Sequence, residues 1–130
     1  MSKPIIQTIT FKASPHDVYE ALMDSKKHTA FTGEKASISR KVGGKYSAYD
    51  NYITGKNLEL VPDEKIVQSW HAVDWAEGIY STITFKLTPI PSGTRLEFTH
   101  EDVPEGTEKE FTQGWIDNYW EPLKAYLEKV

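Results

Sequence analysis

Histidine is the side chain in this sequence best suited to acid–base chemistry, because its usual pKa lies close to neutrality. The chain has four of them: His16, His28, His71 and His100. We expect His16, in the first turn of a helix, and His28, beside exposed lysines, to face solvent. His100 shares the inward face of a strand with Phe98, and two interpretations of it stay open: a hydrogen-bonded core histidine, or a polar anchor in a pocket. Only the second would let His100 act as a general acid or base.

The sequence offers little to other kinds of catalysis. It has no cysteine, which excludes disulfides, thiol chemistry and thiolate metal sites. His71 with Asp74, or His100 with Glu101 and Asp102, could supply metal ligands, but a stable transition-metal site needs three or four converging donors. The glycines form no phosphate-binding loop, and neither Gly-x-Ser-x-Gly nor His-Glu-x-x-His occurs. We therefore expect no catalytic residue, no metal and no cofactor.

Sixteen of the 130 residues are aromatic. Aromatic side chains bury about 150–250 Å² each, so they must either dominate the core or line a cavity. Phe111, Trp115 and Tyr119 form a stripe at helical spacing that faces a predicted sheet. A mostly apolar pocket with few polar groups suits a small hydrophobic ligand. The predicted ligand-binding residues are Trp70, Ile83, Phe85, Phe98, His100, Phe111, Trp115 and Tyr119.

Charge is unevenly distributed along the chain. The net charge is −4, but residues 1–56 hold nine basic and five acidic side chains, a net +4, whereas residues 57–130 hold six and fourteen, a net −8. The acidic balance argues against nucleic-acid binding, and no apolar run is long enough to cross a membrane. The split indicates either a solvated surface or a face that docks on a protein. The predicted partner-binding residues are Lys26, Lys27, Arg40, Lys41 and Trp75.

Alternation with a period of two, bounded by turn residues, predicts a run of strands that would carry these side chains. The expected strands cover residues 4–12, 35–39, 45–50, 52–61, 66–72, 80–88 and 94–102. Gly55 is expected to interrupt the fourth of them.

Helical spacing occurs in three places. A Ser-Pro-His-Asp motif at residues 14–17 starts a short helix, and Ser25 caps a second short helix that ends near Gly33. Residues 108–130 form one long amphipathic helix, which Pro122 bends because its ring clashes with the carbonyl of Asn118. The order of elements predicts a single α+β domain over residues 1–130, with helices on one face of an antiparallel sheet.

Motifs along the whole chain resemble one known family. They are Gly44-Lys45-Tyr46-Ser47, Tyr49-Asp50, residues 53–62, residues 65–70, Trp75, and the ending Gly114-Trp115, Tyr119-Trp120, Pro122-Leu123-Lys124 and Tyr126-Leu127. They resemble the C-terminal domain of the activator of the ninety-kilodalton heat-shock protein ATPase, which belongs to the START-like (SRPBCC) superfamily. The resemblance implies a helix-grip fold, in which a curved antiparallel sheet wraps around a long C-terminal helix and often leaves a hydrophobic cavity.

Two departures from the family pattern bear on the co-chaperone activity. The chain is expected to begin at its first START-like strand, without room for the additional N-terminal domain of the eukaryotic co-chaperone. His71 stands where the family commonly has arginine after the strand tryptophan. Both departures concern activity and leave the expected fold unchanged.

Together, the residues and the resemblance predict a non-catalytic binding protein of the cytoplasm, monomeric or weakly dimeric. It would bind a small apolar molecule between sheet and helix, or a chaperone ATPase through its charged faces, as the resemblance to a stress-response co-chaperone implies. The alternative is an enzyme of the polyketide cyclase or hydrolase kind that uses a cavity residue such as His100. A cluster of titratable cavity groups would favour the enzyme, whereas one or two polar anchors would favour the binding protein.

Overall fold

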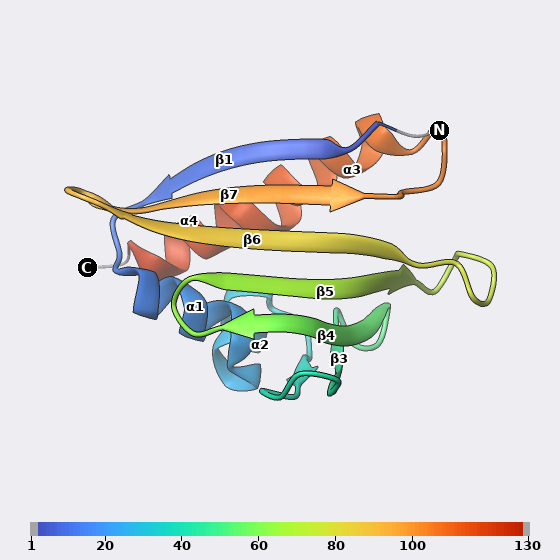
Figure 1. Cartoon of the computed structure of the whole chain (residues 1–130), viewed down its shortest axis with the longest axis horizontal. Coiled ribbons are helices and arrows are strands. Elements are labelled where there is room, and N and C mark those ends of the chain that lie inside the picture. The colour runs from blue at the N-terminus through green and yellow to red at the C-terminus, as the bar shows by residue number, and fades with distance from the viewer. Residues whose placement is uncertain (1–2, 129–130) are drawn as a thin grey trace.

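The computed structural model describes residues 3–128, which form one curved antiparallel sheet with helices covering one face (Figure 1). The strands are β1 (Ile5–Phe11), β2 (Ser37–Ile38), β3 (Lys45–Ala48), β4 (Ile53–Val61), β5 (Lys65–Ala72), β6 (Ser81–Ile90) and β7 (Gly93–Glu101). They lie in the order β1-β7-β6-β5-β4-β3-β2. The helical segments are α1 (Pro15–Met23), α2 (Ser25–Thr32), α3 (Glu108–Trp115), η1 (Ile116–Trp120) and α4 (Glu121–Leu127). The predicted helix-grip arrangement is confirmed.

Alternation places side chains on the core face of the central strands. In β6 and β7 the buried and part-exposed residues alternate, and Phe85 lies opposite Phe98 in the register. Gly55 does not interrupt β4, so that prediction is wrong: the strand runs through Gly55, and the register shifts instead between Asn57 and Glu59. A bulge of this kind inserts one unpaired residue and increases the local twist.

Two short helices follow β1 as predicted. Ser14 caps α1 by accepting a hydrogen bond from the Asp17 backbone N–H at 3.1 Å. The cap of α2 is Asp24, which accepts from the Lys27 N–H, and not Ser25 as expected. The Ser25 hydroxyl instead accepts from the Ile38 N–H at 2.8 Å, which fastens α2 to the edge strand β2.

The long C-terminal helix runs from α3 through η1 into α4, and η1 is a single stretch of π-helix. The prediction extended this helix to residue 130, and residues 129–130 lie outside the described part of the chain. In η1 the Glu121 N–H donates to the carbonyl of Ile116, five residues back. The wide turn lies directly before Pro122, which has no N–H to offer to the carbonyl of Asn118. The effect expected of Pro122 therefore coincides with a change of helix type.

The core lies between the sheet and the helices. Its largest fully buried side chains are Phe11, Phe85, Phe98, Met23, Ile66, Leu96 and Leu123. Within residues 3–128, no helix combines the length and the apolar character that a membrane span requires.

Candidate binding cavity

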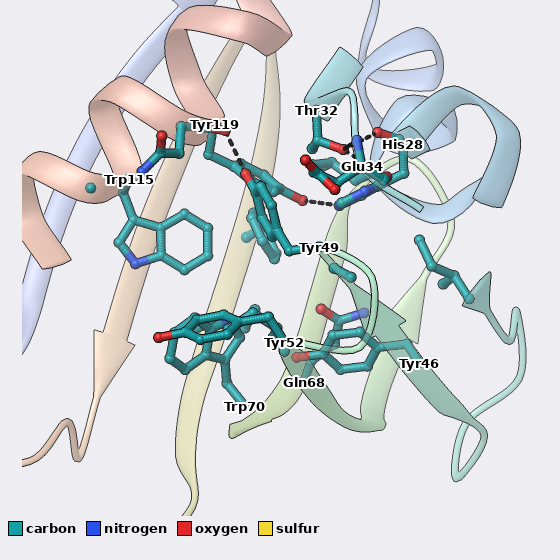
Figure 2. A pocket seen from close by; sticks show the side chains of 18 of the residues that line it. His28, Thr32, Glu34, Tyr46, Tyr49, Tyr52, Gln68, Trp70, Trp115 and Tyr119 are labelled. Atoms are coloured by element: carbon teal, nitrogen blue, oxygen red, sulfur yellow. Dashed lines mark hydrogen bonds between the residues drawn. The ribbon is translucent and has the colours of Figure 1, made fainter. Parts of the chain in front are cut away.

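A cavity of about 720 Å³ opens between the core face of the sheet and the C-terminal helix (Figure 2). Six of the eight predicted ligand-binding residues line it: Trp70, Ile83, Phe85, Phe111, Trp115 and Tyr119. Phe98 and His100 are not among the lining residues. Both are buried against the indole of Trp115, whose ring centroid lies 4.5 Å from that of Phe98. Alternation predicted their inward direction correctly, but the Trp115 ring fills the space in front of them.

Sequence reasoning missed the part of the wall built by α2, β3 and the turn before β4. The lining residues there include His28, Thr32, Glu34, Tyr46, Tyr49, Asp50 and Tyr52, and the missed residues Gln68 of β5 and Asn118 of η1 also line the cavity. The available signal was the set of three tyrosines within seven residues, at positions 46, 49 and 52. Alternation does not reveal this wall, because a turn ends β3 before Tyr49: Tyr49, Asp50 and Asn51 all have positive φ, at 52°, 54° and 71°. Three consecutive non-glycine residues in this region are unusual.

This turn spans the gap between the sheet and the helix. The Tyr49 hydroxyl donates a hydrogen bond to the carbonyl of Asn118, which is the helix carbonyl that Pro122 leaves without its usual donor. The Tyr52 hydroxyl donates to Asp74 Oδ2 at 2.6 Å, and the Asp50 N–H donates to the Lys35 carbonyl at 2.8 Å. The Tyr49 side chain therefore reaches across the cavity from the turn after β3 to the C-terminal helix.

His28 is buried, so the prediction that it faces solvent is wrong. It is 3% exposed, and its Nε2 lies 2.8 Å from the Tyr119 hydroxyl, with which it shares a hydrogen bond. The neighbouring lysines at positions 26 and 27 are exposed, but a helix turns about 100° per residue, and His28 falls on the side that faces Phe31 and Tyr119. Burial lowers the pKa of His28 to about 4, and the ring is therefore neutral at pH 7.

His100 belongs to a closed chain of buried hydrogen bonds. Trp115 Nε1, which can only donate, lies 3.0 Å from His100 Nδ1. Nδ1 is therefore the acceptor, Nε2 carries the proton, and Nε2 donates to Ser81 Oγ at 2.7 Å. Ser81 in turn donates to the carbonyl of Trp70 at 3.2 Å. Burial lowers the pKa of His100 to about 3, and of the two interpretations the hydrogen-bonded core histidine fits this geometry.

The predicted partner-binding lysines and arginine gather at one edge of the sheet. Lys26 and Lys27 are exposed on α2, and Arg40 and Lys41 are exposed in the turn between β2 and β3. The Ser25–Ile38 hydrogen bond brings the two segments together. Arg40 forms an ion pair with Glu20 of α1, which offsets part of its charge.

Trp75 lies away from these basic residues, in the loop between β5 and β6. It is half-buried, and its ring packs edge-on against Trp70 and Phe111, with centroids 5.3 Å and 5.9 Å away. The structure therefore brings the four basic residues together but leaves Trp75 at the aromatic end of the cavity. Of the described residues, no three of the His, Asp and Glu type lie close enough together to hold a metal ion.

Comparisons with known proteins place these features in a wider context. The family model described as "Activator of Hsp90 ATPase homolog 1-like protein" matches residues 12–128. A Dictyostelium discoideum protein named activator of 90 kDa heat shock protein ATPase homolog is 33% identical over 98% of this chain and 36% of its own length. A Mus musculus homolog 2 of that activator is 27% identical over 93% of this chain and 37% of its own. The chain thus spans little more than a third of these relatives.

Two solved structures are similar over nearly the whole chain. An HSP90 activator from Plasmodium falciparum has a TM-score of 0.87 and 29% identity, covering 98% of this chain and 96% of that one. A solution structure described as the Aha1 dimer from Colwellia psychrerythraea has a TM-score of 0.83 and 22% identity, covering 98% and 97%. At that identity, the second likeness concerns the fold alone.

Proposed function

Because the chain belongs to the family of Activator of Hsp90 ATPase homolog 1-like proteins, we propose that it is a non-catalytic binding protein that docks on an Hsp90-type ATPase and holds a small apolar molecule in its cavity. The partner is suggested by the names of its relatives and by the full-length likeness to an HSP90 activator. The curated relatives are almost three times as long as this chain. The proposed docking surface therefore rests on the charges of this chain itself.

The docking proposal is supported by the basic edge, which comprises Lys26, Lys27, Arg40 and Lys41. A group of acidic side chains lies toward the other edge of the sheet, on β7 and at the start of α3, and includes Glu97, Glu101, Glu108 and Glu110. The difference in charge along the sequence therefore becomes a difference across the sheet. Such a separation orients an approaching partner and raises its association rate.

Reversing the lysines of the basic edge should weaken docking. We expect a Lys26→Glu, Lys27→Glu, Lys41→Glu variant to bind purified Hsp90 at least about tenfold more weakly, because each exposed charge at an interface contributes up to about 1 kcal/mol. Isothermal titration calorimetry at two salt concentrations measures the effect, and wild-type affinity should fall as salt rises.

The matched control is Lys86→Glu, Lys109→Glu, Lys124→Glu, which changes the net charge equally at exposed lysines elsewhere. Equal losses in the two triple variants would assign the effect to net charge and contradict docking through the basic edge. Absence of wild-type binding, with no change in ATP turnover by Hsp90, would contradict the partner itself.

The ligand proposal is supported by the volume and the lining of the cavity. About 720 Å³ falls within the range of roughly 300–1,000 Å³ typical of small-molecule sites. Eight lining side chains are aromatic: Tyr46, Tyr49, Tyr52, Trp70, Phe85, Phe111, Trp115 and Tyr119. An apolar wall with a few polar groups at one end is what a small hydrophobic molecule requires.

Filling the cavity should abolish this binding. The neutral fluorophore N-phenyl-1-naphthylamine is expected to bind the wild-type chain at one saturable site, measured by its own emission. Ala48→Phe places a ring inside the cavity and should weaken that binding at least about tenfold, since a phenyl group occupies the volume a ligand needs. Ala125→Phe, at an exposed helix position outside the lining, should bind as the wild type does. Binding that is non-saturable, or equal in the two variants, would contradict the proposal.

The enzyme alternative would need a titratable group that can reach a ligand. Both ring nitrogens of His100 are engaged in the core, and His28 is neutral and bonded to Tyr119. Neither histidine is therefore poised to act as an acid or base near pH 7, which favours binding over cyclase or hydrolase chemistry that uses His100.

A further inference from the structure

The cavity wall is unbalanced in charge. No lysine or arginine is among its lining residues, and the two charged side chains that line it are carboxylates, Glu34 and Asp50. His28 is also in the wall, but its imidazole is neutral at pH 7. Every other side-chain donor of the wall is a neutral amide, hydroxyl or indole. The wall therefore carries negative charge with no compensating cation.

Both carboxylates lie at the solvent-accessible end of the cavity. Glu34 and Asp50 are exposed, whereas Ile66, Ile83 and Phe85 at the other end are almost fully buried. The Asp50 N–H bonds to the carbonyl of Lys35, next in sequence to Glu34, which holds the two acidic residues close together. Lys35 itself does not line the cavity.

The charge of Glu34 acts on Tyr49, which also lines the cavity. Burial raises the pKa of Tyr49, and the charge of Glu34 raises it further, because each disfavours a second negative charge on the phenol oxygen. An anionic ligand at this position would meet the same opposition.

Three of the four tyrosine hydroxyls of the wall direct their hydrogens away from a ligand, and the fourth, that of Tyr119, is bonded to His28. Tyr46 donates to the Ser69 carbonyl at 2.7 Å, Tyr49 to the Asn118 carbonyl, and Tyr52 to Asp74. Each oxygen therefore offers a ligand lone pairs only. These oxygens can therefore accept hydrogen bonds from a ligand that carries hydrogen-bond donors.

On these grounds we propose that the cavity selects a cationic amphiphile, with a protonated amine at the mouth beside Glu34 and Asp50 and an apolar body against Trp70 and Trp115. The inference rests on the proposed ligand-binding function and specifies its ligand class. An ammonium group has three donors and no acceptor, which matches the wall. The aromatic faces add to the attraction, because their quadrupoles favour a nearby cation and oppose an anion.

Three probes of equal chain length separate charge from apolar contact: decylammonium, decan-1-ol and decanoate, each below its micelle concentration. Displacement of N-phenyl-1-naphthylamine at pH 7.5 gives their relative affinities. We expect decylammonium to bind at least about tenfold more tightly than decanoate, with decan-1-ol between them, because the two carboxylates attract the ammonium group and repel the carboxylate of decanoate.

The variant Glu34→Gln, Asp50→Asn should lower the decylammonium-to-decanoate ratio toward one while leaving the affinity for decan-1-ol unchanged. The control Asp102→Asn, Glu121→Gln removes two exposed carboxylates outside the lining and should retain the preference.

The outcomes distinguish this inference from the proposal beneath it. If none of the three probes binds, the proposed ligand function fails, and the inference fails with it. If all bind equally, if decanoate binds best, or if the preference survives Glu34→Gln, Asp50→Asn, the cavity binds ligands but does not select cations, and only this inference is overturned.

Discussion

The free energy of unfolding should fall by about 4 kcal/mol between pH 7.5 and pH 5, because two buried histidines resist protonation in the folded chain. Burial lowers the pKa of His28 to about 4 and that of His100 to about 3, from an ordinary value of 6.5. The unfolded chain therefore takes up protons below pH 6.5 that the folded chain refuses. Stability is complete above that value and is lost as the pH falls toward the folded-state pKa values. Each histidine accounts for about half of the loss.

Urea unfolding at the two pH values measures this effect, and carboxylate titration contributes little in that window. His28→Gln and His100→Gln should each remove about half of the pH dependence. Should His100→Gln fail to fold, the ring proton resonances of wild-type His100 give the answer directly, since they should not titrate down to pH 5. Equal stability at pH 7.5 and pH 5 would contradict the burial of both rings as ordered, neutral groups.

Gly55→Ala should destabilise the fold by about 3 kcal/mol or more, through a collision inside the sheet. A Cβ at this position would lie 1.9 Å from the Ser69 carbonyl oxygen of β5 and 2.7 Å from the ring of Tyr46. The first neighbour is backbone, so relief requires β4 and β5 to separate. Chemical denaturation at pH 7.5 measures the change.

Gly114→Ala is the matched control, since it makes the same change in the C-terminal helix. There the nearest atom to a new Cβ is Asn118 Nδ2 at 3.9 Å, an ordinary contact. Alanine in a helix interior is favoured over glycine, so this variant should gain roughly 0.5–1 kcal/mol. A Gly55→Ala chain as stable as the wild type would show that the two strands can separate at little cost.

The sequence predicts those parts of the structure in which a local residue pattern determines the buried face of a strand or the start of a helix. Alternation in β6 and β7 gave the directions of Phe85, Phe98 and His100, and the Ser-Pro motif gave the start of α1. These are local properties of a strand or a helix end, and they hold whatever packs against them.

The rest depended on contacts between distant segments. The neighbouring lysines predict that His28 faces solvent, but its burial depends on Tyr119, 91 residues away. Likewise, no pattern in the sequence shows where two apolar faces touch and where they stand apart. Phe98 faces inward and is covered by Trp115, whereas Tyr49 lies in a turn and lines the cavity.

The π-helical stretch η1 determines which sides of α3 and α4 face the sheet. A regular helix turns about 100° per residue, so side chains five residues apart point about 140° away from each other. Yet Trp115 and Trp120 are both buried, and their rings stack with centroids 5.7 Å apart. The wide turn of η1 accommodates one extra residue. The apolar sides of α3 and α4 can therefore both face the same sheet. Deleting one residue from η1 would therefore convert the wide turn into a regular one and leave Leu123 in the core, whereas deleting one from the regular turns of α4 would rotate the residues beyond it by about a quarter turn.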